Sequence, residues 1–224
     1  MKLLLLHSPL TGPSVWQNLA PLLQARGFDV LVPDYRDALS GAPPYYPAII
    51  QSIAAQAHEA DVPVAHSGAG ALVSALVSAI SPRAVVFMDA LLPHPGKRWF
   101  DTVPEAMRVH LRGLESGEHL PSWDRWWSTG TLEAMLPDIA LRKVFTAELP
   151  SLPLGYFEEC APDISLPEKF PCAYLQLSSG YDTEVREAQS LGWPTQRLTR
   201  NHLAMLTHPD EAADELCSLM QAIA

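Results

Sequence analysis

The chain has 224 residues, 48% of them hydrophobic, which suits one domain, or one domain with a substantial insertion, around a real core. Its formal net charge of −10 argues against nucleic acid or an anionic membrane as the main partner. Three cysteines without metal-ligand spacing argue against a disulfide framework and favour a reduced, cytoplasmic setting, and no apolar stretch approaches the roughly 18 residues of a membrane helix.

Short apolar runs recur along the chain. The opening "MKLLLLHSPL" resembles a signal peptide, but its four leucines are too few for one, so we expect a first buried strand. Most of the runs lack inside/outside alternation, as strands covered on both faces do. The expected strands are Leu3–Leu6, Asp29–Val32, Val62–Ala65, Ala84–Met88, Ala173–Leu177 and Pro194–Leu198.

Segments of helical pattern lie between these runs. Asn18 is placed to cap a first helix that ends at Gly27. The later helices are expected over Pro47–Glu59, Gly68–Ile80 and Glu184–Leu191, and from Pro209 onward. Alternation of strands and helices predicts an α/β fold, with a doubly wound, mostly parallel sheet of about six strands.

The segment 93–171 breaks this alternation. It has no convincing strand, prolines divide its helical pieces, and it holds four of the six tryptophans: Trp99, Trp123, Trp126 and Trp127. A long insertion with its own helices is typical of a lid over a site, although a helical subdomain that only adds core is the alternative. We therefore expect a core of residues 1–92 and 172–224, with a helical cap of residues 93–171 inserted after the fourth strand.

The string "VAHSGAG" places Ser67 where a buried strand meets a helix. A serine on such a bend projects its hydroxyl above the sheet, and the next N–H can donate to a developing oxyanion. The usual G-x-S-x-G pattern is altered, because Ala65 and Ala69 replace both glycines. Alanine is the next smallest residue, so the pattern favours a nucleophile; a small-residue helix start packed on the sheet is the alternative.

A serine nucleophile needs a histidine base and an acid that orients it. In doubly wound hydrolases the chain order is serine, acid, histidine, and His202 lies between the final strand and the final helix, where that histidine belongs. His208 is closer to the helix start, and the side chain of His66 should point away from Ser67.

Two residues compete for the place of the acid. Asp89 directly follows a buried run, so its carboxylate needs a buried partner. Asp182 follows the next strand, the more frequent position, but an Asp before a helix is also an ordinary N-cap. The balance favours Asp89 narrowly. For the oxyanion we expect the N–H of Gly68 and, since Pro9 has none, that of Leu10 or Ser8.

With these residues assembled, the chain resembles the α/β-hydrolase superfamily over nearly its full length. The matching pieces are "LLLLHSPLTGPSVW", "VLVPDYRD", "VAHSGAGAL", "VVFMDALLP" and "RNHLAMLTHPDEAADEL", and the closest likeness is to small hydrolases with an "HSPL-x-GP" opening. The resemblance implies a short form that lacks the two antiparallel strands usual before the first one. "FMDALLP" is similar to the acid-bearing stretch of haloalkane dehalogenases, which supports Asp89, although Ser67 excludes their aspartate nucleophile.

The family implies cleavage of an ester, thioester, lactone or, occasionally, a C–C bond. The leading hypothesis is a serine hydrolase for a mostly apolar small molecule, without metal or organic cofactor, whose pocket includes Trp99, Trp126, Trp127 and Tyr181. The alternatives are a non-hydrolytic lyase or cyclase that uses Ser67 and His202 as acid–base groups, and a ligand-binding pseudoenzyme. The tryptophans could equally be ordinary lid packing, and the oligomeric state stays open, a homodimer included.

Overall fold

The computed structural model of the chain describes residues 1–57 and 60–223. Its centre is a sheet of six strands in the order β2-β1-β3-β4-β7-β8, and every pair in it is parallel. The strands are β1 (Lys2–Leu6), β2 (Asp29–Leu31), β3 (Val62–Ser67), β4 (Val85–Ala90), β7 (Cys172–Gln176) and β8 (Thr195–Arg197). The expected α/β fold is therefore confirmed, and each strand lies within about two residues of its predicted range.

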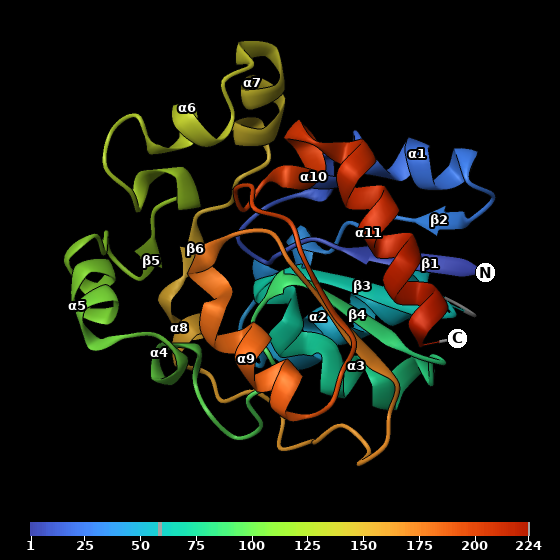
Figure 1. Ribbon diagram of the computed structural model, residues 1–224. Helices are drawn as coiled ribbons and strands as arrows, with labels where there is room; N and C mark the ends of the chain where they lie inside the picture. The colour runs from blue at the N-terminus through green and yellow to red at the C-terminus, as the bar shows by residue number, and fades with distance from the viewer. Residues whose placement is uncertain (58–59, 224) are drawn as a thin grey trace.

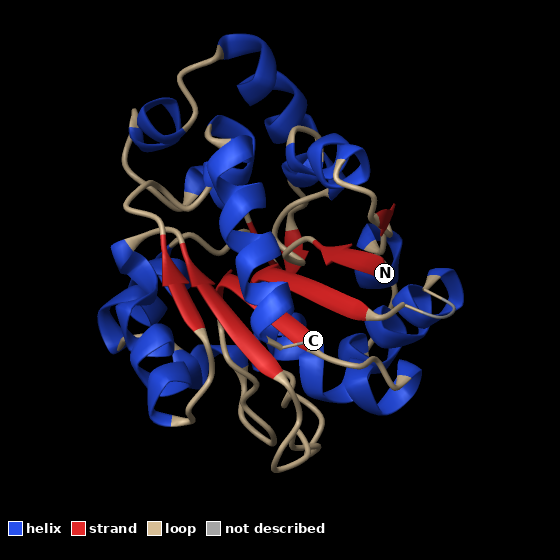
Figure 2. Cartoon of the chain, turned by 45° about the vertical axis from the view of Figure 1, so that its right-hand side comes forward, coloured by secondary structure: helices blue, strands red, loops and turns tan. Residues whose placement is uncertain are grey.

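Helices cover both faces of this sheet (Figure 2), which explains why the strands read as unbroken apolar runs. All residues of β3 and β4 are buried. The main helices of this layer are α1 (Leu19–Ala25), α2 (Tyr45–Gln56), α3 (Val73–Ile80), α9 (Asp182–Ser190) and α11 (Pro209–Ala222), and α1 packs against α11 while α2 packs against α3. None of the helices in residues 1–57 and 60–223 is both long and apolar enough to cross a membrane.

Three details of the expected helices differ in the structure. The predicted cap is absent, because the amide of Asn18 donates instead to the carbonyl of Leu206, 2.7 Å away in the short helix α10 (Ala204–Thr207). The helix expected over Pro47–Glu59 begins two residues earlier and ends at Gln56, and residues 58–59 of the prediction lie outside the described residues. The helix expected from Gly68 begins as a 3-10 turn, η3 (Gly68–Leu72).

Between β4 and β7 the chain leaves the sheet and forms the green-to-orange part at the left and top of Figure 1. This segment contains α4 (Trp99–Thr102), α5 (Glu105–Gly113), α6 (Thr131–Met135), α7 (Ile139–Ala147) and α8 (Leu154–Glu158). The expectation of no strand here is wrong, since β5 (His119–Leu120) pairs antiparallel with β6 (Leu152–Pro153). Each of these strands has two residues, too few to produce a recognisable alternation in the sequence.

The order of the strands places the first crevice of the sheet between β1 and β3. The chain runs from β1 outward to β2 and then returns to the other side of β1 to form β3. In open parallel sheets, ligands bind beyond the carboxyl ends of the strands at such a reversal. Ser67 is the last residue of β3, so the topology puts it at this edge.

Candidate active site

Ser67 sits on a sharp bend between β3 and η3. Its φ of 56° and ψ of −127° are unfavourable for a residue with a side chain and cost about 1–3 kcal/mol. Such strain persists only where the surroundings enforce it, and it is the backbone of a serine that projects from a strand-to-helix turn. The Ser67 side chain lines a cavity above the sheet edge.

Both glycines that follow Ser67 have close neighbours. A Cβ at Gly70 would overlap the carbonyl oxygen of Leu91, and one at Gly68 would lie 2.8 Å from the Ser8 hydroxyl oxygen. Ala65 and Ala69 are fully buried, and the structure accommodates their methyl groups. The strict need for glycine therefore falls three residues after the serine, at Gly70, because the contact at Gly68 is with the end of a side chain that can shift.

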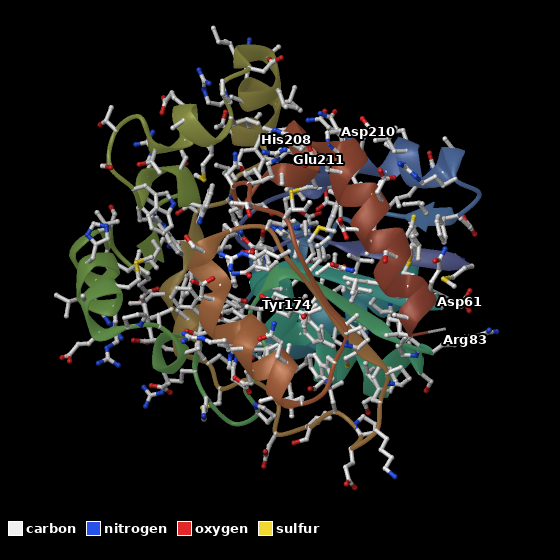
Figure 3. All side chains as sticks on the ribbon, in the orientation of Figure 1. Asp61, Arg83, Tyr174, His208, Asp210 and Glu211 are labelled. Carbon is white, nitrogen blue, oxygen red and sulfur yellow. The ribbon has the colours of Figure 1, made fainter. Side chains whose placement is uncertain are left out.

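An irregularity in the sheet places Asp89 in the site. The pairing of β3 with β4 shifts between His66 and Ser67, so that Ser67 pairs with Ala90 and Asp89 is the extra residue. Asp89 has a φ of 43°, as a bulge residue can. The hydroxyl of Tyr174, at the centre of the molecule in Figure 3, donates to the Ala90 carbonyl at 2.7 Å and accepts from the Ala90 N–H at 3.0 Å.

The Asp89 carboxylate is fully buried and accepts four hydrogen bonds. The backbone N–H groups of Leu177 and Ser178 donate to Oδ1 at 2.8 and 3.0 Å. The Ser178 hydroxyl donates to Oδ2 at 2.6 Å, and Nδ1 of His202 reaches the same oxygen at 2.7 Å. These donors offset the loss of water around the charge. Because Nδ1 carries the proton, Nε2 of the neutral imidazole is free to accept one.

Asp182, the competing acid, lies away from His202. It is the first residue of α9, its carboxylate accepts a hydrogen bond from the Gln176 amide at 2.6 Å, and Arg197 lies 3.6 Å from it. These residues line a separate polar crevice. Of the two sequence candidates, the structure brings Asp89 to the imidazole and gives Asp182 other partners. His208, labelled in Figure 3, stands directly before α11 and bonds to the hydroxyl of Thr207.

Ser67 and His202 line the same cavity, but the hydroxyl partner of Ser67 in this structure is Tyr181. The two hydroxyl groups share a hydrogen bond of 3.2 Å. The Tyr181 ring also stacks on the imidazole of His202, with centroids 5.2 Å apart and an interplanar angle of 12°. Burial raises the pKa of Tyr181, so its hydroxyl stays protonated. Tyr181 thus contacts both groups expected to react.

His66 is a functional candidate that the sequence reasoning did not assign. Its fully buried ring lies 4.4 Å from the His202 ring, and its Nε2–H donates to the His202 carbonyl at 3.1 Å. Burial lowers the pKa of His66 well below 6.5, so this ring is neutral. A buried histidine in a strand needs a hydrogen-bond partner, and that requirement was the signal in the sequence.

The two expected oxyanion donors differ in their surroundings. Gly68 and Leu10 both line the cavity. The Leu10 N–H donates to the Ser8 hydroxyl at 3.2 Å, while Ser8 itself is buried and does not line the cavity. An oxyanion would therefore have to share the Leu10 N–H with the Ser8 hydroxyl or displace that hydroxyl from it.

The cavity has a volume of about 490 Å³, within the usual range for a small-molecule site. The four predicted pocket residues, Trp99, Trp126, Trp127 and Tyr181, all line it, together with Trp123, Val103, Met107, Met135 and Glu184. A larger cleft of about 870 Å³ lies elsewhere and contains none of the predicted site residues. Within the described part of the chain, no three His, Cys, Asp or Glu side chains are grouped so as to hold a metal ion.

Comparison with solved structures shows the fold over the whole chain. An extracellular alpha/beta-hydrolase from a Paenibacillus species is 18% identical with a TM-score of 0.73, and the match covers 100% of this chain and 99% of that one. A pyrethroid hydrolase from Sphingobium faniae JZ-2 is 18% identical with a TM-score of 0.71, covering 99% and 98%. Polyneuridine aldehyde esterase is 16% identical with a TM-score of 0.70, covering 98% of each chain.

Comparison by sequence gives a family but no individual relative. No curated protein matches the chain. The model of the alpha/beta hydrolase family matches residues 3–215, which include the bend at Ser67, the bulge at Asp89 and the loop of His202. Since this match spans nearly the entire sequence and the fold agrees with it, the chain belongs to the alpha/beta hydrolase family.

Proposed function

We propose that the protein is a serine hydrolase that cleaves an ester, thioester or lactone of a mostly apolar small molecule. The observation that carries this proposal is the 2.7 Å contact between the fully buried Asp89 carboxylate and His202, which lines the same cavity as the strained Ser67. The esterases and the pyrethroid hydrolase among the structural neighbours give independent support for hydrolysis on this fold.

The reaction would begin when the Ser67 hydroxyl exchanges Tyr181 for Nε2 of His202. Ser67 Oγ then attacks the carbonyl carbon while Nε2 takes its proton, and Asp89 holds the resulting imidazolium through Nδ1. The Gly68 and Leu10 N–H groups would stabilise the oxyanion. Nε2 returns the proton to the departing alcohol or thiol. Water, deprotonated by the same nitrogen, then attacks the acyl group, and Nε2 passes that proton to Ser67 Oγ as the acid leaves.

We further propose that residues 93–171 act as a cap that supplies most of the substrate contacts. Trp99, Trp123, Trp126 and Trp127 come from this segment, and all four line the cavity that contains Ser67. Aromatic side chains bury large apolar areas, so an acyl or alcohol group with apolar bulk would gain most from this wall.

Hydrolysis of p-nitrophenyl acetate and labelling by a fluorophosphonate test the proposal together. The wild-type protein should hydrolyse the ester and become labelled at Ser67, and Ser67→Ala should lose both properties while keeping its circular dichroism spectrum. Hydrolysis retained in Ser67→Ala would exclude Ser67 as the nucleophile. An intact but unlabelled Ser67 would favour the lyase or cyclase alternative, for which the Ser67–Tyr181 hydrogen bond is the supporting contact.

A further inference from the structure

One carboxylate lines the otherwise largely apolar substrate cavity. Glu184, in the first turn of α9, is half-buried there. No Lys or Arg is among the described residues that line the cavity, and none of the ion pairs between described residues involves Glu184. Burial raises the pKa of the Glu184 carboxyl, a hydrogen bond from its own backbone N–H acts in the opposite direction, and the nearby charges of Glu187 and Asp89 raise the pKa further.

The tryptophans of the same cavity form two perpendicular pairs. Trp99 and Trp126 meet edge to face with centroids 6.0 Å apart and an angle of 69°. Trp123 and Trp127 do so at 5.9 Å and 75°. In a perpendicular pair the edge of one ring is directed at the face of the other, and all four of these rings line the cavity. The face of an aromatic ring is its electronegative part, and several such faces attract a cation.

We propose that this cavity selects substrates that carry an ammonium group, with Glu184 as the counter-ion and the tryptophan faces as the remaining walls. The inference rests on the proposed hydrolase function and specifies its substrate class. Glu184 has here the role of a specificity-determining residue, because the hydrogen-bond partners of the Ser67 hydroxyl and of the His202 Nδ1 are Tyr181 and Asp89 rather than Glu184.

A cationic group fits these observations better than a neutral or anionic one. A neutral hydroxyl could donate to one oxygen of Glu184, but it would gain less from the tryptophan rings than a cation and would not neutralise the partly buried charge. An anionic group would meet Glu184 without any lining Lys or Arg to offset the repulsion. The net charge of −10 also raises the concentration of cations near the protein.

Binding of two unreactive probes of equal shape tests the inference without requiring turnover. Choline and 3,3-dimethylbutan-1-ol differ only in a quaternary nitrogen replaced by carbon, and tryptophan fluorescence reports occupancy of the cavity. We expect wild-type protein to bind choline at least about tenfold more tightly than the alcohol, as an ion pair with cation–π contacts would give. Glu184→Gln, which keeps the shape of the side chain, should reduce this ratio to about one.

Glu187→Gln is the matched control. Glu187 is exposed on α9, one turn beyond Glu184, and does not line the cavity, so its loss removes the same charge from the same helix. The preference for choline should persist in this variant. The inference is overturned if wild type binds no choline, if it binds the alcohol as tightly, or if Glu184→Gln keeps the wild-type ratio.

Turnover separates this inference from the proposed function. In kcat/KM, acetylcholine should exceed 3,3-dimethylbutyl acetate by about tenfold or more in wild type and in Glu187→Gln, and this excess should disappear in Glu184→Gln. Hydrolysis of p-nitrophenyl acetate, which has no cationic group, reports on the hydrolase function alone. If that ester is cleaved through Ser67 without any preference for the cationic substrate, the function stands and the role of Glu184 falls. If no ester is cleaved but choline is preferred through Glu184, the role of Glu184 stands and the hydrolase function falls.

Discussion

Nδ1 of His202 and Oδ2 of Asp89 lie 2.7 Å apart, and Oδ2 also accepts a hydrogen bond from the Ser178 hydroxyl. This bond fixes the tautomer of the imidazole, and it depends on a carboxylate, because an amide in its place could present an N–H to Nδ1. The tautomer with the proton on Nε2 cannot act as a base toward Ser67.

Asp89→Asn should therefore lower kcat/KM for p-nitrophenyl acetate by about a thousandfold or more. Asp182→Asn is the matched control, since Asp182 contacts Gln176 and Arg197 rather than His202, and it should retain wild-type activity within about threefold. Comparable losses of activity in the two variants would show that Asp89 is not the residue that orients His202.

His66 should position the loop of His202 through its Nε2–H bond to the His202 carbonyl. His66→Phe keeps a buried ring but has no donor, so we expect kcat to fall by about 10- to 100-fold with little change in KM. His66→Gln places an amide donor near the same point and should restore part of the rate. An equal fall in both variants, in proportion to their loss of unfolding free energy, would indicate packing alone.

Tyr181→Phe should remove only the hydrogen bond that Ser67 must give up before it meets His202. The ring that stacks on His202 remains, and loss of one neutral hydrogen bond in the ground state is worth about 1 kcal/mol. We therefore expect kcat/KM to stay level or to rise by up to about fivefold. A fall of more than about tenfold would mean that the Tyr181 hydroxyl takes part in the reaction itself.

Buried histidines should make the fold sensitive to acid. Burial lowers the pKa of His7 from 6.5 to about 4, so between these values the unfolded chain binds a proton that the folded chain does not. The free energy of unfolding must then fall as the pH falls through this window, by about 3 kcal/mol from His7, and His66 adds a loss of the same sign.

Urea denaturation of wild type and His7→Asn at several pH values between 7 and 4 checks this prediction. Asparagine does not titrate, and its amide can replace the donor that Nδ1 of His7 presents to the Ser8 carbonyl at 2.7 Å. The variant should show a shallower dependence on pH, whatever its stability at pH 7. Parallel curves would exclude His7 as a source of the acid sensitivity.

Gly70→Ala should be the most damaging change near the bend. The added methyl would overlap the carbonyl oxygen of Leu91, and relieving such an overlap would cost several kcal/mol through movement of β3 or β4. Ala69→Gly, one residue earlier, leaves the bend intact and should cost about 1 kcal/mol. Thermal unfolding of the two variants gives the comparison, and a well-folded Gly70→Ala protein would contradict the packing described for Gly70.

Much of the fold could be predicted from the sequence because strands buried on both faces must be apolar throughout. The runs ending at Leu6, Met88 and Leu177 therefore marked β1, β4 and β7 to within about two residues. Ser67 and His202 could be proposed from the sequence because small residues and chain order restrict where a nucleophile and a base can stand. The pair of strands β5 and β6 was not predicted, because a strand of two residues shows no periodicity.

The contacts that arise only after folding could not be read from the sequence. The bulge at Asp89 depends on how β4 pairs with β3, and so does the choice between Asp89 and Asp182. Tyr181 was expected in the pocket, but its contact with Ser67 depends on how the loop after β7 folds back over the sheet. His66 was expected to face away from Ser67, and nothing local indicated that the same direction leads to His202.

The strands on either side of the 93–171 segment, β4 and β7, are neighbours in the sheet, joined by their own ladder and by the bonds from Leu177 and Ser178 to Asp89. The sheet itself therefore holds the two ends of the inserted segment next to each other. The inserted segment also touches the loop of His202, because the Asn201 amide donates to the Met135 carbonyl at 3.0 Å and the Trp123 ring lies 6.1 Å from the His202 ring. A change at Met135 or Trp123 would therefore reach the imidazole directly, whereas the Asp89 carboxylate is held by the sheet side alone.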